Sequence, residues 1–423
     1  METGIKLRLI IFNILIKIYK NNLNFENLFI NKYESNRLSR RDRAFIQTVC
    51  LTTMRYQFHT KKILNQFLKK KYKSNQYILL ISAITQILFL EFKDYAVIHS
   101  SVELAKKLKI YPGLINAVLN KISNQKKLLI KTKVDYEDLP YWFKEKNYLL
   151  SSDQKKKFLN NFFQKPSIHI VFKDKKDLAN NKDEIINTSE KSGFLVSNKK
   201  IEDVDGYILG KWWVQDFSTM LPIAALKNLK NKKVLDLCAA PGGKTFQLLS
   251  AKANVDINDI NNKRLVKLNS NLKRLGYHKK VTNMNALNFP TQKKYDYVII
   301  DSPCSGIGTI RRNPEIFFKQ NPPNFKSLIN LQKKLLIKGS ELLNKNGILI
   351  YMVCSFFPEE TINQMNFFIK KNKNFSILKF PLINKKINNE KFFDKEGFFF
   401  TLPSLYVNSP IDGFFAVMFL KND

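Results

Sequence analysis

Two of the four cysteines in this chain occupy matching places in the sequence. Cys304 lies in "DSPCSGIGTIRRNPEI" (residues 301–316), just after the apolar run "YDYVII", and Cys354 ends the apolar run of "NGILIYMVCSFFPEE" (346–360). Short apolar runs of this kind are typical of buried strands in a parallel sheet. A single cysteine is more often a small buried hydrophobe. Because parallel strands share one carboxyl edge, where doubly wound sheets bind ligands, we expect the two thiols at one functional site.

Two thiols at one site suit the methylation of carbon 5 of a pyrimidine. That carbon is a poor nucleophile until a thiolate adds to carbon 6, after which carbon 5 can take a methyl group from a sulfonium. The adduct must then lose its carbon 5 proton and expel the thiol, and a donor or acid must hold the polar edge of the ring. Asp301 follows the same apolar run as Cys304. The pattern predicts Cys304, Cys354 and Asp301 as catalytic residues.

The stretch "VLDLCAAPGGKT" (234–245) reads as a strand, a glycine turn and the start of a helix. Such a turn lets a ligand approach the backbone and the free N–H groups of the helix. A phosphate-binding P-loop would need glycine at the position of Cys238, and Pro241 removes one N–H group. A nucleoside-type cofactor such as S-adenosylmethionine fits better. The predicted cofactor residues of the turn are Cys238, Ala239, Ala240, Pro241, Gly242, Gly243 and Lys244.

A nucleoside cofactor also requires an acidic residue at the end of the next strand, to accept hydrogen bonds from the ribose. Asp256 and Asp259 are both candidates, and we favour Asp259 because it just precedes Asn261, the expected helix cap. Asp256 would lie in mid-strand. Asn285 follows the next strand and could bond a base edge, while Asp236 lies inside the first strand and is expected to be structural.

The pattern of elements predicts three domains. From residue 226 to 423, strands alternate with helices, which indicates an α/β, doubly wound, Rossmann-like sheet; we expect one long helix from "KSLINLQKK" to Asn346-Gly347. Residues 131–225 read as helices followed by a small α+β subdomain. Residues 1–130 read as all-α. The most apolar stretch, 77–92, is too short and too polar to span a membrane, and the N-terminal segment reads as an amphipathic helix rather than a signal peptide.

The net charge of +36 favours a polyanionic partner such as RNA. Residues 1–130 carry 23 basic and seven acidic residues, and "LSRRDRAF" (38–45) holds Arg40, Arg41 and Arg43. Two origins of this charge unrelated to RNA stay open. The excess of Lys over Arg is what AT-rich codon usage would give, and the arginines could be solvated charges at a helix start capped by Ser39. The predicted RNA-binding residues are Arg40, Arg41, Arg43, Lys244, Arg311 and Arg312.

These motifs resemble those of the RNA 5-methylcytosine methyltransferases. The resemblance is carried, in order, by "WWVQDFSTM", "LDLCAAPGGKT", "DSPCSGIGTIRRNPEI", "CSFFPEE" and "DGFF". The N-terminal helices, with "RDRAFIQTVC", "YAVIHSSVELAK" and "GLINAVLNKI", resemble a domain similar to the antiterminator NusB. The resemblance covers nearly the whole chain and implies a class I methyltransferase domain after a NusB-like domain.

The resemblance also implies a function and a division of roles. It implies transfer of a methyl group from S-adenosylmethionine to carbon 5 of a cytosine in small-subunit (16S) ribosomal RNA, through a covalent cysteine adduct. In this family the later cysteine, here Cys354, is the nucleophile, and the cysteine after the proline, here Cys304, assists product release. The cofactor positions map to 238–244, Asp259, Asn285 and Asp301. Asn285 departs from the family's usual Asp, and Val353 from its usual Thr.

Three alternatives compete with this function. An RNA-binding assembly protein with a decayed methylase fold would have lost the nucleophile or the turn, and neither is lost. A P-loop ATPase lacks its first glycine, and transfer RNA is the main alternative substrate. Because no Cys/His cluster has zinc spacing and the four cysteines suggest no disulfide framework, we expect no metal and a reducing, cytoplasmic location. We further expect a monomer without membrane contact.

Overall fold

The computed structural model describes residues 2–32, 38–68, 72–147, 150–179, 184–196, 199–381, 392–394 and 396–422. The chain forms two compact units. The first, called the helical unit, comprises residues 1–163 and 310–323, and the second, called the α/β unit, comprises 164–309 and 324–423. The domain boundaries at residues 130 and 225 stay a prediction: the helices of 131–163 belong to the first unit, and the strands that follow belong to the second.

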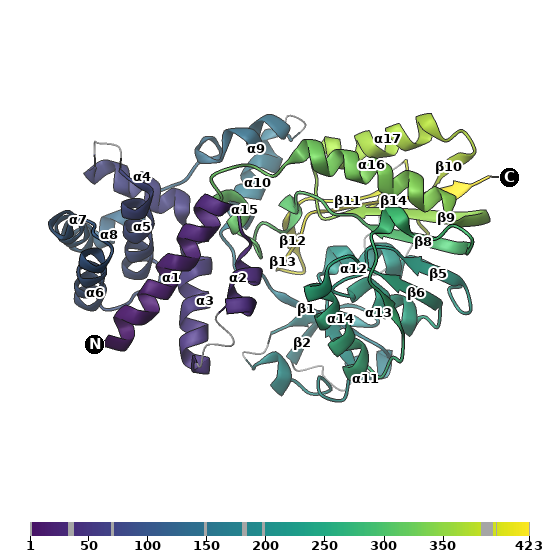
Figure 1. Cartoon of the computed structure of the whole chain (residues 1–423), viewed down its shortest axis with the longest axis horizontal. Coiled ribbons are helices and arrows are strands. Elements are labelled where there is room, and N and C mark those ends of the chain that lie inside the picture. The colour runs from purple at the N-terminus through teal and green to yellow at the C-terminus, as the bar shows by residue number, and fades with distance from the viewer. Residues whose placement is uncertain are drawn as a thin grey trace. The chain divides into compact units, whose positions relative to one another are not determined.

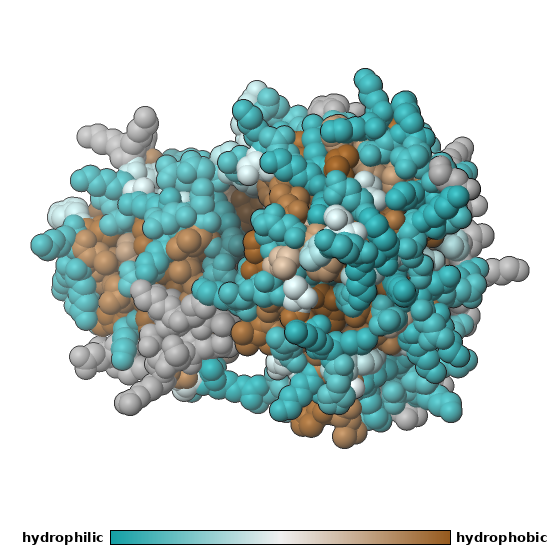
Figure 2. Space-filling view, turned by 45° about the vertical axis from the view of Figure 1, so that its right-hand side comes forward, coloured by the Kyte–Doolittle hydropathy of each residue, from teal (hydrophilic) through white to brown (hydrophobic). Residues whose placement is uncertain are grey.

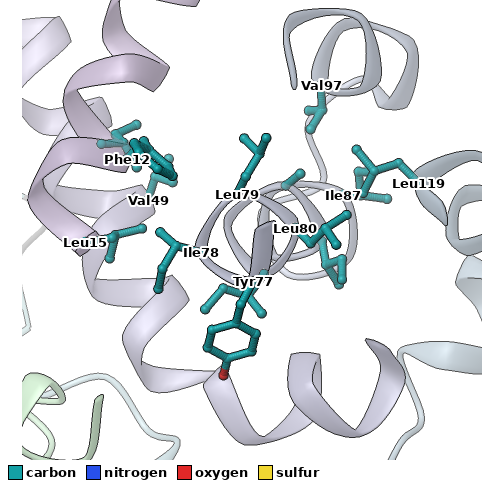
Figure 3. Close-up of a cluster of buried hydrophobic side chains, with 14 of the residues drawn as sticks. Phe12, Leu15, Val49, Tyr77, Ile78, Leu79, Leu80, Ile87, Val97 and Leu119 are labelled. Atoms are coloured by element: carbon teal, nitrogen blue, oxygen red, sulfur yellow. The ribbon is translucent and has the colours of Figure 1, made fainter. Parts of the chain in front are cut away.

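The helical unit confirms the all-α prediction for the N-terminal region. Its main helices are α1 (Glu2–Asn21), α2 (Phe25–Lys32), α3 (Arg40–Arg55), α4 (Gln57–Phe67), α5 (Ser74–Leu88), α6 (Asp94–Lys107), α7 (Pro112–Asn124), α8 (Lys126–Leu129), α9 (Tyr141–Lys146) and α10 (Ser152–Phe162). Helix α5 is buried along its whole length from Tyr77 to Leu88, as expected for the most apolar stretch. Its neighbours contribute side chains such as Leu15, Val49 and Leu119 to the same core (Figure 3).

A segment from the second half of the sequence completes this unit. Residues 310–323 include the short helix α15 (Glu315–Phe318). The Phe317 ring lies edge-on to the Phe143 ring with their centroids 4.8 Å apart, and Phe318 packs in the same way against Tyr19 at 5.7 Å. The motif that begins at Asp301 therefore runs into the helical unit, and the residues just after it pack in the core there, a position that the sequence pattern does not predict.

The α/β unit begins with a small antiparallel sheet. Its strands are β1 (Ile168–Phe172), β2 (Ile185–Ser189), β3 (Ser192–Leu195) and β4 (Trp212–Val214), arranged in the order β2-β3-β1-β4, and helix α11 spans Lys175–Ala179. His169 on β1 is buried between two polar partners: its Nδ1 lies 2.7 Å from the Gln215 carbonyl oxygen and its Nε2 lies 2.8 Å from the Thr188 hydroxyl. The predicted α+β subdomain is present as this sheet.

The main sheet is doubly wound, as predicted. Its order is β10-β14-β9-β8-β5-β6-β7, with β11 paired to β14, and strands β5 to β9 run parallel. Helices α12, α13 and α14 lie on one face of the sheet, and α16 and α17 lie on the other (Figure 1). The strands are β5 (Lys233–Asp236), β6 (Asn254–Asn258), β7 (Val281–Thr282), β8 (Tyr295–Asp301), β9 (Leu343–Val353), β10 (Phe375–Leu378), β11 (Phe399–Thr401) and β14 (Phe414–Lys421). The helices are α12 (Phe217–Ala224), α13 (Gly243–Ser250), α14 (Asn262–Arg274), α16 (Phe325–Glu341) and α17 (Ile362–Lys371).

Alternating side chains of the central strands form a hydrophobic core on each face of the main sheet. On β8, Ile299 packs in the cluster that contains Leu248 of α13, whereas Val298 and Ile300 pack in the cluster that contains Leu336 of α16. Successive side chains of a strand point to opposite faces, so a continuous apolar run is buried on both sides. This explains why the run "YDYVII" reads as a central strand.

One predicted element is wrong. The sequence predicts a helix that continues to Asn346-Gly347, but α16 ends at Glu341 and β9 begins at Leu343. Leu343 pairs with Tyr295 on β8, and the register then shifts so that Ile348 pairs with Tyr297. Asn346 has a left-handed φ of 58°, which suits a bulge as well as it suits a helix stop. Pairing with β8 therefore ends the helix earlier than its local pattern suggests.

The surfaces of both units that face the viewer in Figure 2 are mostly hydrophilic. Among the described residues, no helix combines the length and the apolarity needed to cross a membrane.

Candidate active site

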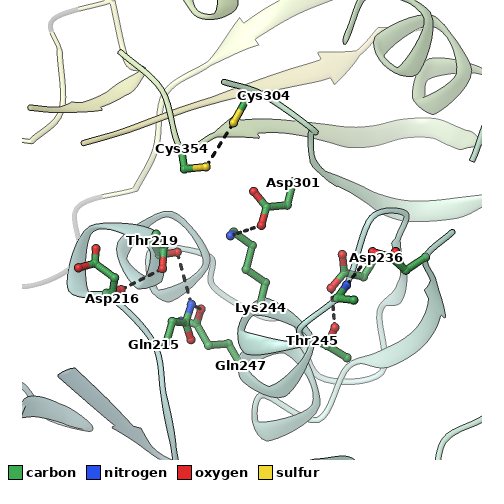
Figure 4. A network of polar contacts seen from close by, with 12 residues as sticks. Gln215, Asp216, Thr219, Asp236, Lys244, Thr245, Gln247, Asp301, Cys304 and Cys354 are labelled. Atoms are coloured by element: carbon green, nitrogen blue, oxygen red, sulfur yellow. Dashed lines mark hydrogen bonds and ion pairs between the residues drawn. The ribbon is translucent and has the colours of Figure 1, made fainter. Parts of the chain in front are cut away.

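The two predicted thiols lie side by side. Cys304 follows β8 and Cys354 follows β9, and their sulfur atoms are 3.2 Å apart (Figure 4). Both are free thiols and partly exposed. The contact with Cys354, followed by burial among protein atoms, raises the pKa of Cys304 well above its ordinary value. Cys304 therefore stays protonated at neutral pH and can donate its S–H group to the Cys354 sulfur.

Asp301 and Lys244 form an ion pair in the same region. The Lys244 ammonium donates to Asp301 Oδ2 over 2.6 Å, and the two side chains point toward one another below the thiols in Figure 4. Lys244 comes from the first turn of α13 and its side chain is 9 % exposed, whereas Asp301 at the end of β8 is 32 % exposed. Lys244 also lies over the Phe414 ring at 5.0 Å. A lysine held in this way by a carboxylate is not directed into a phosphate cradle, which argues against the P-loop alternative.

The glycine turn has a backbone geometry that suits the predicted nucleoside cofactor. Gly242 has a φ of +110°, and a Cβ atom there would lie 2.4 Å from both the Leu268 and the Phe246 side chains. Only glycine therefore fits, and α13 begins directly after it with its N-terminal N–H groups at the sheet edge. Thr245 on this helix donates to the buried carboxylate of Asp236 over 2.6 Å. Asp236 is structural, as predicted.

Asp259 lies beside the turn, and Asp256 does not. Asp259 follows β6 and is 8 % exposed; one oxygen accepts from the Ala240 amide at 3.0 Å and the other from the Asn261 amide at 2.7 Å. Each carboxylate oxygen has a second lone pair, so a ribose hydroxyl could still donate to it. Asp256 lies in mid-strand and accepts from the Tyr295 hydroxyl over 2.6 Å. The choice of Asp259 fits this geometry and stays a prediction until binding is measured.

Asn285 lies just after β7, as its place in the sequence predicts. It is exposed and caps a 3-10 turn, η4 (Ala286–Asn288), by accepting from the Leu287 amide over 3.0 Å. Its amide N–H₂ group is a donor that the usual Asp of the family lacks. Asn in place of Asp therefore keeps the cap of η4 but gives a ligand a hydrogen-bond donor that Asp would not provide.

The predicted RNA-binding arginines differ in exposure. Ser39 caps α3 by accepting from the Asp42 amide, a feature of the alternative without RNA binding, and Arg40 and Arg41 on the first turn are exposed. Arg43 is half-buried and Arg312 is exposed. Arg311 is only 1 % exposed, and its carbonyl oxygen accepts from the Arg55 guanidinium over 2.8 Å. The prediction that Arg311 binds RNA is therefore corrected, because a buried guanidinium does not reach a phosphate without rearrangement.

Sequence reasoning missed a buried carboxylate at this site. Glu360, in the 3-10 turn η6 (Pro358–Glu360), is fully buried and hydrogen-bonded to both Ser305 and Ser355, each next in sequence to one of the two cysteines. The only signal in the sequence was the "PEE" ending of the second motif. Nothing in that pattern identifies partners that lie far away along the chain.

The strand order and the site define a methyltransferase with a Rossmann-like fold. Residues 223–420 match the family described as 16S rRNA methyltransferase RsmB/F, and residues 5–124 match the NusB family. The chain is thus similar to the RsmB/F family over its methyltransferase domain and to the NusB family over its N-terminal domain. The fold class inferred from the sequence is confirmed, as is the family resemblance.

Relatives with related names agree with this similarity, and solved structures share the fold. Ribosomal RNA small subunit methyltransferase B of Serratia proteamaculans is 28 % identical over 362 residues, which cover 79 % of this chain and 83 % of the relative. The protein of the same name from Proteus mirabilis is 27 % identical and covers 87 % of this chain and 92 % of the relative. The crystal structure of PH0851 has a TM-score of 0.73 at 18 % identity, over 99 % of this chain and 98 % of that one. NSun6 from Pyrococcus horikoshii has a TM-score of 0.56 at 15 % identity, over 66 % of this chain and 97 % of that one. These two structures show a shared fold.

Proposed function

We propose that this protein transfers a methyl group from S-adenosylmethionine to carbon 5 of a cytosine in 16S ribosomal RNA, through a covalent adduct with Cys354. The observation that carries the proposal is the pair of thiols 3.2 Å apart at the carboxyl edge of a methyltransferase sheet. The names of the relatives from Serratia and Proteus support small-subunit ribosomal RNA as the substrate class.

The first step follows from the electrostatics of the thiol pair. A thiolate, not a thiol, attacks carbon 6, so one of the two cysteines must lose its proton. The raised pKa of Cys304 keeps that residue protonated, and its S–H group stabilises negative charge on the Cys354 sulfur. This difference between the two thiols supports Cys354 as the attacking residue, in agreement with the roles that the family resemblance implies.

The later steps need the same two residues. As the bond between Cys354 and carbon 6 forms, the ring electrons make carbon 5 nucleophilic, and it takes the methyl group of the bound sulfonium. A base then takes the carbon 5 proton, the electrons of that carbon–hydrogen bond restore the double bond between carbon 5 and carbon 6, and the carbon–sulfur bond breaks with its electron pair on Cys354. We assign help in this elimination to Cys304, because its sulfur lies beside the sulfur that must depart.

Asp301 and Lys244 suit recognition of the base. An ionised Asp301 can accept a hydrogen bond from the exocyclic amino group of cytosine, which uracil lacks. Its paired Lys244 supplies a positive charge where the ring becomes negative during attack. This pair therefore favours cytosine over uracil.

The methyl donor would be held by the turn and by Asp259. The Gly242 position admits no side chain, and the N-terminus of α13 presents N–H groups beside it. Asp259 would accept from the ribose hydroxyls and Asn285 would lie at the adenine side. The NSun6 structure, determined with the S-adenosylmethionine analogue SFG, is consistent with such a site in this fold.

A transfer assay with a labelled methyl donor tests the function. Unmodified 16S ribosomal RNA should gain label that nuclease digestion recovers as 5-methylcytidine, and Cys354→Ser should gain none. Transfer RNA in a parallel reaction tests the alternative substrate. Label recovered in another nucleoside, or gained by transfer RNA and not by 16S RNA, would contradict the proposal.

A further inference from the structure

The carboxylate of Glu360 joins the two segments that carry the thiols. Oε1 accepts from the Ser305 amide at 2.8 Å and from the Gln332 side-chain amide at 3.1 Å. Oε2 accepts from the Ser305 hydroxyl at 2.5 Å and from the Ser355 hydroxyl at 2.6 Å. Each oxygen therefore receives two donors, and these donors come from the segment after β8, the segment after β9 and helix α16.

The neighbours of Glu360 are the residues next to the cysteines. Ser305 directly follows Cys304, and Ser355 directly follows Cys354. Glu360 itself is anchored, since its carbonyl oxygen accepts from the buried Tyr351 hydroxyl at 2.8 Å. A further bond joins the two segments, from the Gly308 amide to the Cys354 carbonyl oxygen at 3.0 Å. Glu360 thus fixes both cysteine-bearing segments to one point.

We propose that Glu360 is a positioning residue that holds the Cys304 and Cys354 sulfurs in the geometry for attack and release. Its catalytic consequence rests on the proposed function, whereas its effect on the thiol geometry does not. Among the described residues, no Lys, Arg or His pairs with this fully buried carboxylate. Burying a charge without a cation is costly, and the four donors offset that cost only while both serine-bearing segments stay in place.

The charge of Glu360 has a second effect that agrees with this role. It is among the causes that raise the pKa of Cys304, after the contact with Cys354 and burial. Glu360 therefore helps to keep Cys304 in the protonated form that stabilises a Cys354 thiolate.

The first test measures the thiol geometry in the free protein, without RNA or methyl donor. The protein is equilibrated with reduced and oxidised glutathione, and peptide mass spectrometry measures the fraction with a Cys304–Cys354 disulfide. This fraction gives the effective concentration of one thiol relative to the other. We expect Glu360→Gln to lower this value at least about tenfold. The N–H₂ group of glutamine would face groups that now donate to the carboxylate, so the hydrogen bonds that hold the two serine hydroxyls would be lost. Glu359→Gln, in the same 3-10 turn, is the matched control and should change it less than about twofold.

The second test measures catalysis. Glu360→Gln should lower kcat about 100-fold while KM for RNA changes little, because the thiols and not the RNA-binding surface are displaced. Should Glu360→Gln fold poorly, the double variant Ser305→Ala/Ser355→Ala removes the same hydroxyl bonds and should show a similar drop in the effective thiol concentration.

The two measurements separate the possible failures. A lowered melting temperature with an unchanged effective concentration of the thiols would show that Glu360 is only structural and would overturn the inference. A lowered effective concentration in a protein whose wild type methylates no RNA would support the positioning role and refute the proposed function.

Discussion

At the scale of single residues, the proposed chemistry depends on two sulfur atoms 3.2 Å apart and on the carboxylate of Glu360, which bonds to the serine after each cysteine. Cys304, Cys354 and Asp301 could be placed at one sheet edge because each follows an apolar run. The 3.2 Å distance between the sulfurs depends on the pairing of β8 with β9, which no local pattern encodes. Glu360 escaped prediction for the same reason: Ser305 and Gln332 lie 55 and 28 residues away along the chain.

The residue-scale prediction concerns the cofactor. Asp259→Ala should weaken S-adenosylmethionine binding by ~1.5–3 kcal/mol, because a hydrogen bond to a charged acceptor disappears and the turn loses its bond from the Ala240 amide. Isothermal titration calorimetry measures the change. Asp256→Ala is the control, since that side chain contacts Tyr295 and Lys293 instead of the turn. Equal effects of the two substitutions would refute the assignment of Asp259.

At the scale of elements, periodicity predicted the alternating strands and helices of the α/β unit. It failed at Asn346-Gly347, because a dipeptide that commonly stops a helix here forms a bulge in a strand. The choice between the two depends on the Leu343–Tyr295 pairing, a long-range contact. The presence of a strand or helix could thus be predicted where burial imposed a pattern on the sequence. The residues at which each one begins and ends could not be predicted.

The element-scale prediction concerns pH and the small sheet. Burial lowers the pKa of His169 to about 4, although the bond to the Gln215 carbonyl oxygen opposes this shift. In the unfolded chain, His169 takes up a proton as the pH falls below its ordinary pKa of 6.5. In the folded chain, it takes up that proton only near pH 4. Stability is therefore complete above pH 6.5 and is lost as pH falls toward 4, by about 2 kcal/mol between about pH 7.5 and about pH 5.

Urea unfolding of the wild type and of His169→Gln at these two pH values measures this contribution. The variant should be less stable at the higher pH and should lose less stability on acidification. His59, whose pKa burial also lowers to about 4, contributes equally to both proteins and cancels in the comparison. Parallel losses in the two proteins would show that His169 does not carry the effect.

At the scale of the whole molecule, the pattern of elements predicted three domains and the composition predicted a polyanionic partner. The sequence could not predict that residues 310–323 belong to the helical unit, because that packing rests on contacts such as Phe317 with Phe143, far apart in sequence. Nor does it predict which of the many basic residues contact RNA. Arg311 shows why: it is basic but buried, and only an exposed side chain can contact RNA.

The whole-molecule prediction concerns RNA docking by the helical unit. Changing Arg40, Arg41 and Arg43 together to Gln should weaken RNA binding and flatten its salt dependence, by ~0.7–0.9 slope units for each phosphate that these arginines no longer neutralise. Changing the exposed Lys107, Lys109 and Lys121 to Gln removes the same charge from the same unit and is the control. Filter binding across a salt series measures both slopes. If the two variants behave alike, the arginine cluster is only the charged start of α3.

The most direct test of the covalent mechanism is the trapping of RNA by cysteine variants. Cys304→Ala should still allow attack and methyl transfer but impair elimination, so protein joined to methylated RNA should accumulate on a denaturing gel. Cys354→Ala removes the attacking sulfur and should give neither adduct nor product. Trapping by Cys354→Ala and not by Cys304→Ala would reverse the two roles. Full activity in both variants without any adduct would contradict the covalent mechanism.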